Sequence, residues 1–150
     1  MRFTSQRDYQ TMLHINKELI NTVIDTPVIV FKLNSEVTKT NSYGEATKKT
    51  WYVGVQVPCL VRRNQLMSNA DMQTVNFEQS VDFEFLRAEL ETRNIYPEVG
   101  DVIEYHDSLY EVNTINEVQL YAGRTEYNHS IVCNSHLTRR TNLQLERPAL

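Results

Sequence analysis

The feature that most constrains this chain is a two-residue alternation of apolar and polar side chains in its second half. In residues 81–85, Val and Phe side chains alternate with carboxylates, which is typical of a strand with one buried face. Residues 102–105 and 109–112 are two more strand-like runs, joined by a tight connection, and residues 130–137 form another. A chain built from such runs favours an antiparallel sheet.

The first half contains strand-like runs as well. Residues 28–33 are mostly apolar, and residues 51–57 alternate until Pro58 ends the predicted ladder. The members of the second run predicted to share one face are Trp51, Val53, Val55 and Val57. Residues 86–93 are compatible with a short helical turn.

Residues 5–24 are predicted to form an amphipathic helix. Apolar residues recur there mostly at three- and four-residue spacing. They are Tyr9, Met12, Leu13, Leu19, Ile20 and Val23. Ser5 is a suitable N-cap with Asp8 three residues later, and Pro27 ends the helix by disfavouring helical angles at Thr26. We expect the apolar stripe to pack on the chain's own core.

Three polar segments interrupt this pattern. Residues 34–50 are predicted to be an extended arm, a long hairpin or a disordered loop, and residues 62–76 a second irregular loop. Fixing residues 34–50 alone would cost roughly 17–34 kcal/mol of backbone entropy. Such arms make sense if contacts with neighbouring subunits offset that cost. The third segment is the C-terminal tail, residues 138–150.

These observations predict a mainly β (α+β) fold: a small antiparallel β-barrel or sandwich with an N-terminal helix and two long extended loops. The length of 150 residues suits one domain spanning residues 1–150. No apolar run approaches the ~20 residues of a membrane span, and the first residues lack the apolar stretch of a signal peptide. We therefore expect a protein made in a cytoplasm, without membrane contact.

Catalytic and metal-binding chemistry is not indicated. Cys59 and Cys133 are expected to be free thiols, and strand geometry separates His129 from Cys133 by about 13 Å, too far to share a metal ion. There is no P-loop or dinucleotide fingerprint, so we expect no cofactor, no metal and no enzymatic activity. One alternative stays open: a small hydrolase that uses acids such as Asp82, Glu84 or Asp101.

Three basic doublets lie in or beside irregular segments: Lys48-Lys49, Arg62-Arg63 and Arg139-Arg140. They could contact an acidic partner surface or phosphate, or simply keep the chain soluble. The formal net charge of −4 argues against a general nucleic-acid clamp. A small nucleic-acid-binding barrel remains a less favoured alternative.

The order of several motifs resembles a known family. The chain begins with a helix, a β-rich run and a polar segment. These are followed by a strand ending in Pro, a Phe-rich strand, a turn–strand–hairpin unit and a last strand. The motifs are Tyr43-Gly44-Glu45-Ala46, Val55-Gln56-Val57-Pro58, Val81-Asp82-Phe83-Glu84-Phe85, the stretch Pro97 to Tyr105 with its Pro-x-x-Gly-Asp turn, Leu109-Tyr110-Glu111-Val112, and Gly123. Over most of residues 5–137 the chain resembles the neck, or head-closure, proteins of tailed bacteriophages, particularly contractile-tailed ones. It is shorter than the longer members, and its tail from Arg139 to Leu150 has no match among them.

The resemblance implies a structural virion protein of the neck, assembled in the host cytoplasm. Such proteins form a homo-oligomeric ring, usually a hexamer, below the portal and adaptor proteins and above a tail terminator or tail tube. They close the DNA-filled head and dock the tail, while DNA passes the lumen without sequence-specific binding. A different tail component, such as a tail terminator or baseplate protein, is the main alternative. The acidic balance fits a channel wall that repels phosphate.

The residue pattern and the resemblance together suggest which residues lie at interfaces and which form turns. Candidate interface residues are Val37, Tyr43, Gly44, Glu45, Leu66, Met67, Arg62, Arg63, Arg139 and Arg140. The aromatic and Met side chains among them are types enriched at interfaces. Candidate structural turn residues are Pro97, Gly100, Asp101 and Gly123. No residue is expected to be catalytic.

Overall fold

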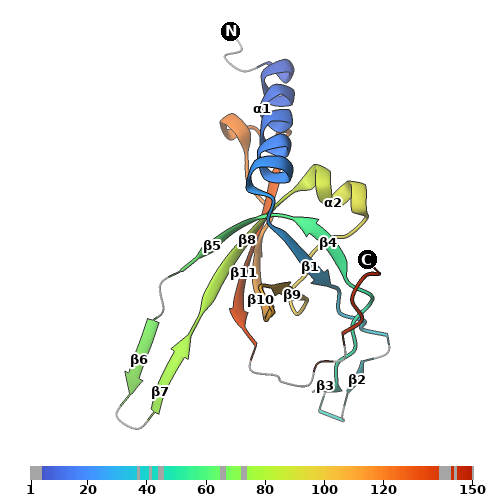
Figure 1. Cartoon of the computed structure of the whole chain (residues 1–150), viewed down its shortest axis with the longest axis vertical. Coiled ribbons are helices and arrows are strands. Elements are labelled where there is room, and N and C mark those ends of the chain that lie inside the picture. Colours follow the sequence, from blue (N-terminus) through green and yellow to red (C-terminus); the bar gives the residue numbers. More distant parts are fainter. Residues whose placement is uncertain are drawn as a thin grey trace.

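A seven-stranded antiparallel sheet forms the centre of the molecule, in the order β4-β1-β9-β10-β11-β8-β5 (Figure 1). The computed structural model describes residues 5–36, 38–40, 42–43, 46–64, 67–71, 74–138, 143 and 145–149. The strands of this sheet are β1 (Pro27–Phe31), β4 (Val55–Pro58), β5 (Leu60–Arg63), β8 (Ser80–Leu86), β9 (Val102–Tyr105), β10 (Ser108–Asn116) and β11 (Ser130–Leu137). With the N-terminal helix, this confirms the predicted mainly β fold class.

The sheet is curled so far that its two edges meet at one end. β4 and β5 are opposite edges of the sheet, yet Cys59 alone separates them along the chain. Figure 1 shows the strands converging at this end and spreading apart at the other, as in a half-open barrel. The Cys59 amide donates to the carbonyl oxygen of Thr26 at 3.1 Å, which ties the corner to the start of β1.

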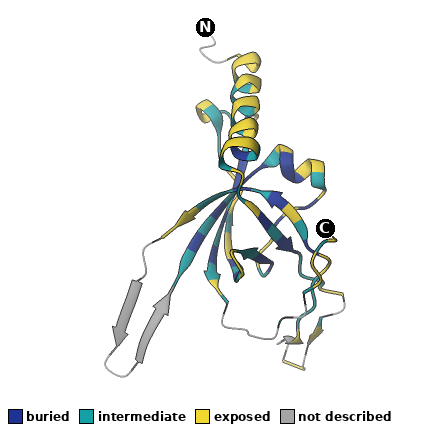
Figure 2. Ribbon diagram, viewed as in Figure 1, coloured by how far each residue is buried: buried dark blue, intermediate teal, exposed yellow. Residues whose placement is uncertain are grey.

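The core fills the concave side of the curled sheet. In β8 the alternation predicted from sequence is realised, because Val81, Phe83 and Phe85 are each fully buried (Figure 2). The Phe83 ring packs edge-on against Tyr105 and Tyr110, with centroids 6.0 and 5.6 Å away. The other buried residues of this cluster are Val28, Val30, Val57, Cys59, Leu90, Ile95, Ile103, Val112, Ile131 and Cys133.

Two helices accompany the sheet. Helix α1 (Gln6–Glu18) continues into a π-helical segment, η1 (Leu19–Ile24), and helix α2 (Arg87–Arg93) packs against β4 and β8. Ser5 caps α1 in a reciprocal box with Asp8, as the sequence predicts. A third, short 3-10 segment, η2 (Tyr121–Gly123), lies in the connection between β10 and β11.

Two short ribbons lie outside the main sheet. β2 (Lys39–Thr40) pairs with β3 (Ala46–Lys48), and β6 (Met67–Asp71) pairs with β7 (Thr74–Glu78). The hairpin interpretation of residues 34–50 therefore fits the described part of that segment. The interpretation of residues 62–76 as irregular is wrong, because the end of β5, all of β6 and most of β7 fall within them. The polar composition hid these strands, since a ribbon that stands away from the core needs no apolar face.

The predicted strand at residues 51–57 is also wrong in part. Regular pairing with β1 begins only at Val55, and Trp51 forms an isolated bridge with Leu33. Val53 is 49% exposed instead of sharing a buried face with Val57. The cause is local: the Gly54 amide donates to the carbonyl oxygen of Glu146 at 2.8 Å, so the C-terminal segment pairs with the chain there.

Candidate docking surfaces

The projecting elements lie at opposite ends of the molecule. Helix α1 extends beyond the end where the strands converge, and the ribbons β2–β3 and β6–β7 extend beyond the open end (Figure 1). The long axis therefore joins a helical end to a ribbon end. Each end presents structure that contributes little to the core.

The β6–β7 ribbon continues the β5–β8 hairpin away from the sheet. Its five residue pairs run from Met67 opposite Glu78 to Asp71 opposite Thr74. In the described part of the chain, the substantial contacts of β6 and β7 are with each other. An isolated two-stranded ribbon is marginally stable in water, so an additional partner would stabilise it.

The shorter β2–β3 ribbon is tied to the sheet at its base. The Asn34 amide donates to the Thr50 carbonyl at 2.8 Å, and Lys49 pairs with Glu111 at 3.1 Å. Its tip carries Tyr43, which is 91% exposed. A Tyr ring is an amphipathic group that interfaces use often, so this position suits a contact residue.

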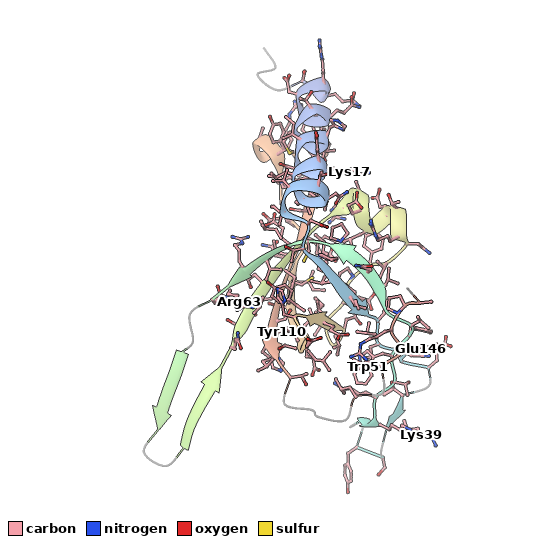
Figure 3. All side chains as sticks on the ribbon, viewed as in Figure 1. Lys17, Lys39, Trp51, Arg63, Tyr110 and Glu146 are labelled. Carbon is pink, nitrogen blue, oxygen red and sulfur yellow. The ribbon has the colours of Figure 1, made fainter. Side chains whose placement is uncertain are left out.

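Helix α1 contacts the rest of the chain near its start and near its end. Near its start, the Tyr9 ring stacks on Tyr127 with centroids 4.3 Å apart and lies 5.9 Å from Tyr121. Near its end, Lys17 Nζ lies 3.2 Å from the carboxylate of Glu89 on α2 (Figure 3). No residue of α1 itself is buried, although Ile20 of η1 is.

The outer side of this helix carries an unpacked apolar stripe. Ile15, Leu19 and Val23 follow one another at four-residue spacing and are 56%, 42% and 71% exposed (Figure 2). The prediction that the stripe packs on the chain's own core is therefore wrong for Leu19 and Val23. The helix projects past the end of the sheet, so its outer side has no core to meet.

Glu89 is the electrostatic centre of the α1–α2 contact. Its side chain is 3% exposed and accepts hydrogen bonds from Asn21 and from Arg93, in addition to its pair with Lys17. Burial by itself would raise the pKa of this carboxyl, but the bonds from Arg93, Asn21 and Lys17 outweigh burial and lower it. Sequence analysis missed this group, although the four-residue spacing of Glu89 and Arg93 in a predicted helix was an available signal.

Both members of one basic doublet have partners within the chain. Arg62 pairs with Glu84 at 3.1 Å, and the Arg63 guanidinium lies 5.5 Å from the centre of the Tyr105 ring. Figure 3 shows Arg63 where β5 leads toward the ribbon. Arg62 remains largely exposed, so it is accessible to another molecule despite its pairing.

One of the seven remaining predicted interface residues, Met67, is among the residues that the structure describes. Met67 begins β6. The other six lie outside the described residues: Val37, Gly44, Glu45, Leu66, Arg139 and Arg140.

Three of the four predicted turn residues, Pro97, Gly100 and Asp101, lie in the turn between α2 and β9. Asp101 is 1% exposed and accepts from the amides of Leu33 and Glu98 at 2.8 and 2.7 Å. Burial raises its pKa despite these bonds. Gly100 has a φ of 95°, which favours glycine, and Gly123 lies in η2 with a φ of 68°. Pro97 is buried in this turn.

The carboxylates considered as catalytic candidates are engaged in hydrogen bonds, and the two thiols are buried. Asp82 accepts from Asn134 at 2.6 Å, and Glu84 accepts from Ser130 at 3.1 Å and from Arg62. Burial raises the pKa of both Cys59 and Cys133 to about 12, so these thiols are poor nucleophiles. Among the described residues, no three His, Cys, Asp or Glu side chains gather to hold a metal ion. The helices in that part of the chain are also too short or too polar to span a bilayer.

Comparison with known proteins finds a distant structural similarity. Neither the family models nor the curated proteins include a match to this sequence. Among solved structures, the chain is similar to one from the virion of a native gene transfer agent (GTA) particle, with a TM-score of 0.47 and 9% sequence identity. The similarity covers 76% of this chain and 94% of the other.

Proposed function

We propose that this chain is a non-enzymatic structural subunit of a phage virion that forms a homo-oligomeric ring at the head–tail junction. Its neighbours along the axis are portal or adaptor proteins on one side and a tail terminator or tail tube on the other. The sequence resemblance to neck proteins supports this role. The ring is expected to be a hexamer that closes the DNA-filled head and docks the tail.

The observation that carries the proposal is the placement of α1 and the β6–β7 ribbon at opposite ends of a compact sheet. Within the described part of the chain, the apolar stripe on the outer side of α1 is exposed to solvent. The ribbon strands β6 and β7 pair mainly with each other. A subunit in a ring between two axial neighbours has use for both ends. Head-to-tail contacts closed by rotation also need two different surfaces on each copy.

The chemistry of the surface suits a channel that DNA passes. The net charge of −4 repels phosphate overall. Tight, salt-dependent binding to DNA is therefore not expected. This is the observation that favours a neck component over a nucleic-acid-binding barrel.

Electron cryomicroscopy of particles that carry this chain with an added tag tests the proposal. The expected result is extra density in a ring, six copies around the axis, between portal and tail. Density at the distal end of the tail would favour a baseplate protein instead. An untagged particle prepared in parallel identifies the extra density.

A further inference from the structure

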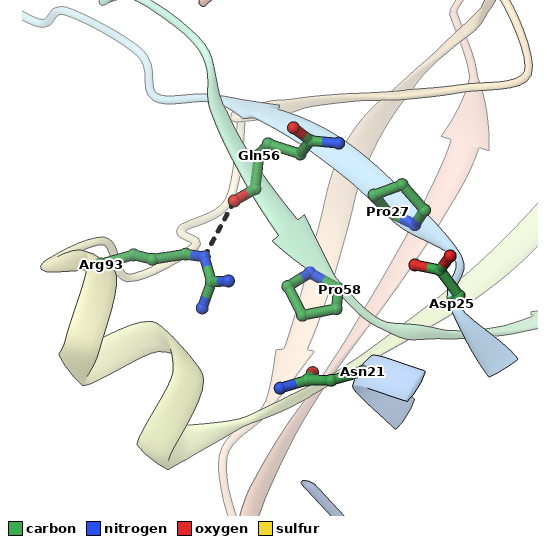
Figure 4. A pocket seen from close by; sticks show the side chains of 6 residues that line it. All are labelled: Asn21, Asp25, Pro27, Gln56, Pro58 and Arg93. Atoms are coloured by element: carbon green, nitrogen blue, oxygen red, sulfur yellow. Dashed lines mark hydrogen bonds between the residues drawn. The ribbon is translucent and has the colours of Figure 1, made fainter. Parts of the chain in front are cut away.

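The β4 edge of the main sheet is blocked against further strand pairing. Arg93 donates through Nε to the Gln56 carbonyl at 3.0 Å, and Pro58 has no amide hydrogen to offer (Figure 4). The Gly54 amide, just before β4, donates to the Glu146 carbonyl at 2.8 Å. Proteins commonly cover or interrupt an edge strand in this way, because an unpaired strand is a template for pairing with another chain.

The β5 edge and the β2–β3 ribbon are protected by other means. β5 has four residues and ends in Arg62 and Arg63, both of which are exposed. In the β2–β3 ribbon, Lys39 lies opposite Lys48, and the register shifts between Lys39 and Thr40. Short strands, basic side chains and an irregular register all discourage pairing with a further strand.

The β6–β7 ribbon has none of these protections. Its five residue pairs follow one another without a register shift. Neither strand contains Lys, Arg, Pro or Gly, and the acidic residues Asp71 and Glu78 stand at strand ends. Within the described ranges, β6 and β7 form a sheet of two strands, so neither outer edge is covered by a third. Such a ribbon is marginally stable alone, and its regular, unprotected edges are suited to pairing.

We propose that β6 of one copy pairs with β7 of the next copy around the ring, so that the ribbons join into one closed antiparallel sheet. The inference rests on the proposed function, which supplies the ring. The free edges of β6 and β7 lie on opposite sides of the ribbon, so a single type of contact, repeated around the axis, uses both. Closure leaves no edge exposed.

The symmetry of a ring gives these strands the direction that pairing needs. The ribbon extends toward one end of the molecule (Figure 1). When the ring axis follows the long axis of the molecule, rotation carries each strand onto its copy without reversing its direction along the axis. β6 of one copy and β7 of the next therefore run in opposite directions, as β6 and β7 do within one chain. A second copy thus fits both edges without a change in the ribbon.

The test is chemical cross-linking in particles assembled from an equal mixture of two full-length chains. One chain carries Ser68→Cys in β6, and the other carries Asn76→Cys in β7 and a size tag. A bismaleimide that reaches about 8 Å spans one strand spacing with an offset of two residues. The native thiols Cys59 and Cys133 are fully buried and should not react. Because each chain has one added thiol, a dimer containing both chains can form only between copies.

The expected product is a dimer of one tagged and one untagged chain, in larger yield than either dimer of like chains. The matched control is a mixture of Lys39→Cys and Lys48→Cys chains, which places the thiols on the protected ribbon and should give little dimer. No mixed dimer, or an equal yield from the control pair, overturns the proposal. A cross-link to a portal, adaptor or tail protein in place of the mixed dimer would identify another occupant and would also overturn it.

An Ala70→Lys substitution in both single-cysteine chains sharpens the result. It gives β6 a lysine of the kind that β2 and β3 already carry, so the mixed dimer should be lost. The melting temperature of the free chain should not change, because the ribbon lies outside the core. The control Ala70→Thr adds a side chain that strands favour and should keep the mixed dimer. A mixed dimer that persists in Ala70→Lys contradicts the proposal.

Failure of this inference can be told from failure of the proposed function. A ring at the head–tail junction without the mixed dimer would remove the ribbon pairing and keep the function. A mixed dimer from a ring located elsewhere in the particle would do the reverse.

Discussion

The curled sheet and the β6–β7 ribbon contain the same kind of hydrogen-bonded strand pairs, yet they differ in what lies beside them. In the sheet, β8 has a strand on each side and a continuous buried face at Val81, Phe83 and Phe85. In the ribbon, β6 and β7 have each other. Backbone pairing alone gives a strand its geometry, but burial of apolar surface provides most of its stability.

The curled sheet therefore has its own buried core, whereas the projecting elements are suited to contact other protein subunits. Changes in the sheet should therefore alter folding, and changes in the projecting parts should alter assembly.

Phe83→Ala is expected to have the largest effect. The ring is fully buried and packs against both Tyr105 and Tyr110, so its removal leaves a cavity in the core. The free energy of unfolding should fall by about 3–5 kcal/mol, measured by urea denaturation. A loss below about 1 kcal/mol would mean that the two halves of the curled sheet do not share this core.

Gly54→Ala is expected to destabilise the chain by about 1–3 kcal/mol. A Cβ atom at this position would lie 2.5 Å from Ile29 Cγ2 and 2.6 Å from Phe31 Cε1. Thermal unfolding of the variant, beside Val53→Ala as the control, measures the effect. The neighbouring Val53 is half-exposed, so its truncation should cost little. Equal melting temperatures for the two variants would contradict the close packing at Gly54.

Glu89→Gln should destabilise the α1–α2 contact by about 1–2 kcal/mol at pH 7. The pKa of Glu89 is lowered in the folded chain, so the carboxylate contributes stability above its unfolded value of 4.5. That contribution is lost as the pH falls through the lowered value. Denaturation of both proteins between about pH 3 and pH 7 should show the difference shrinking toward the acid end. The exposed Glu18→Gln is the control, and a pH-independent difference would contradict the assignment.

Shortening the ribbon should have the smallest effect on folding. Replacing residues 65–78 with two glycines joins β5 to β8, keeps the Gln79 carbonyl that accepts from the Leu137 amide, and leaves Asn64 bonded to the Ser80 carbonyl. The free energy of unfolding should change by less than about 0.5 kcal/mol, as for surface changes in general. Light scattering with the partner proteins present should show loss of assembly. Unimpaired assembly would mean that the ribbon is not a contact element.

The same contrast explains how much of the fold the sequence could predict. The alternation at residues 81–85 and the two-residue turn at His106 and Asp107, both with positive φ, were readable because local pattern and final environment agree. The ribbon and the outer face of α1 were misjudged for a shared reason. An apolar pattern predicts packing only if the chain buries that surface against its own core. These elements project beyond the sheet, so they have no core to pack against.

The candidate contacts could be predicted in type but not in position. Exposure of Tyr43 follows from its place in a polar segment. The Glu89 cluster depends on α1 and η1 meeting α2, and these lie far apart along the chain. No local spacing signals such a meeting, so tertiary structure was needed to find it.

Hydrogen exchange of the β6 and β7 amides, in the free chain and in the assembled particle, tests the central claim most directly. If neighbouring subunits complete the ribbon, these amides exchange rapidly in the free chain and become strongly protected in the particle, while β8 amides are protected in both. Equal protection of the ribbon in the two states would show that it needs no neighbour, and would contradict the account.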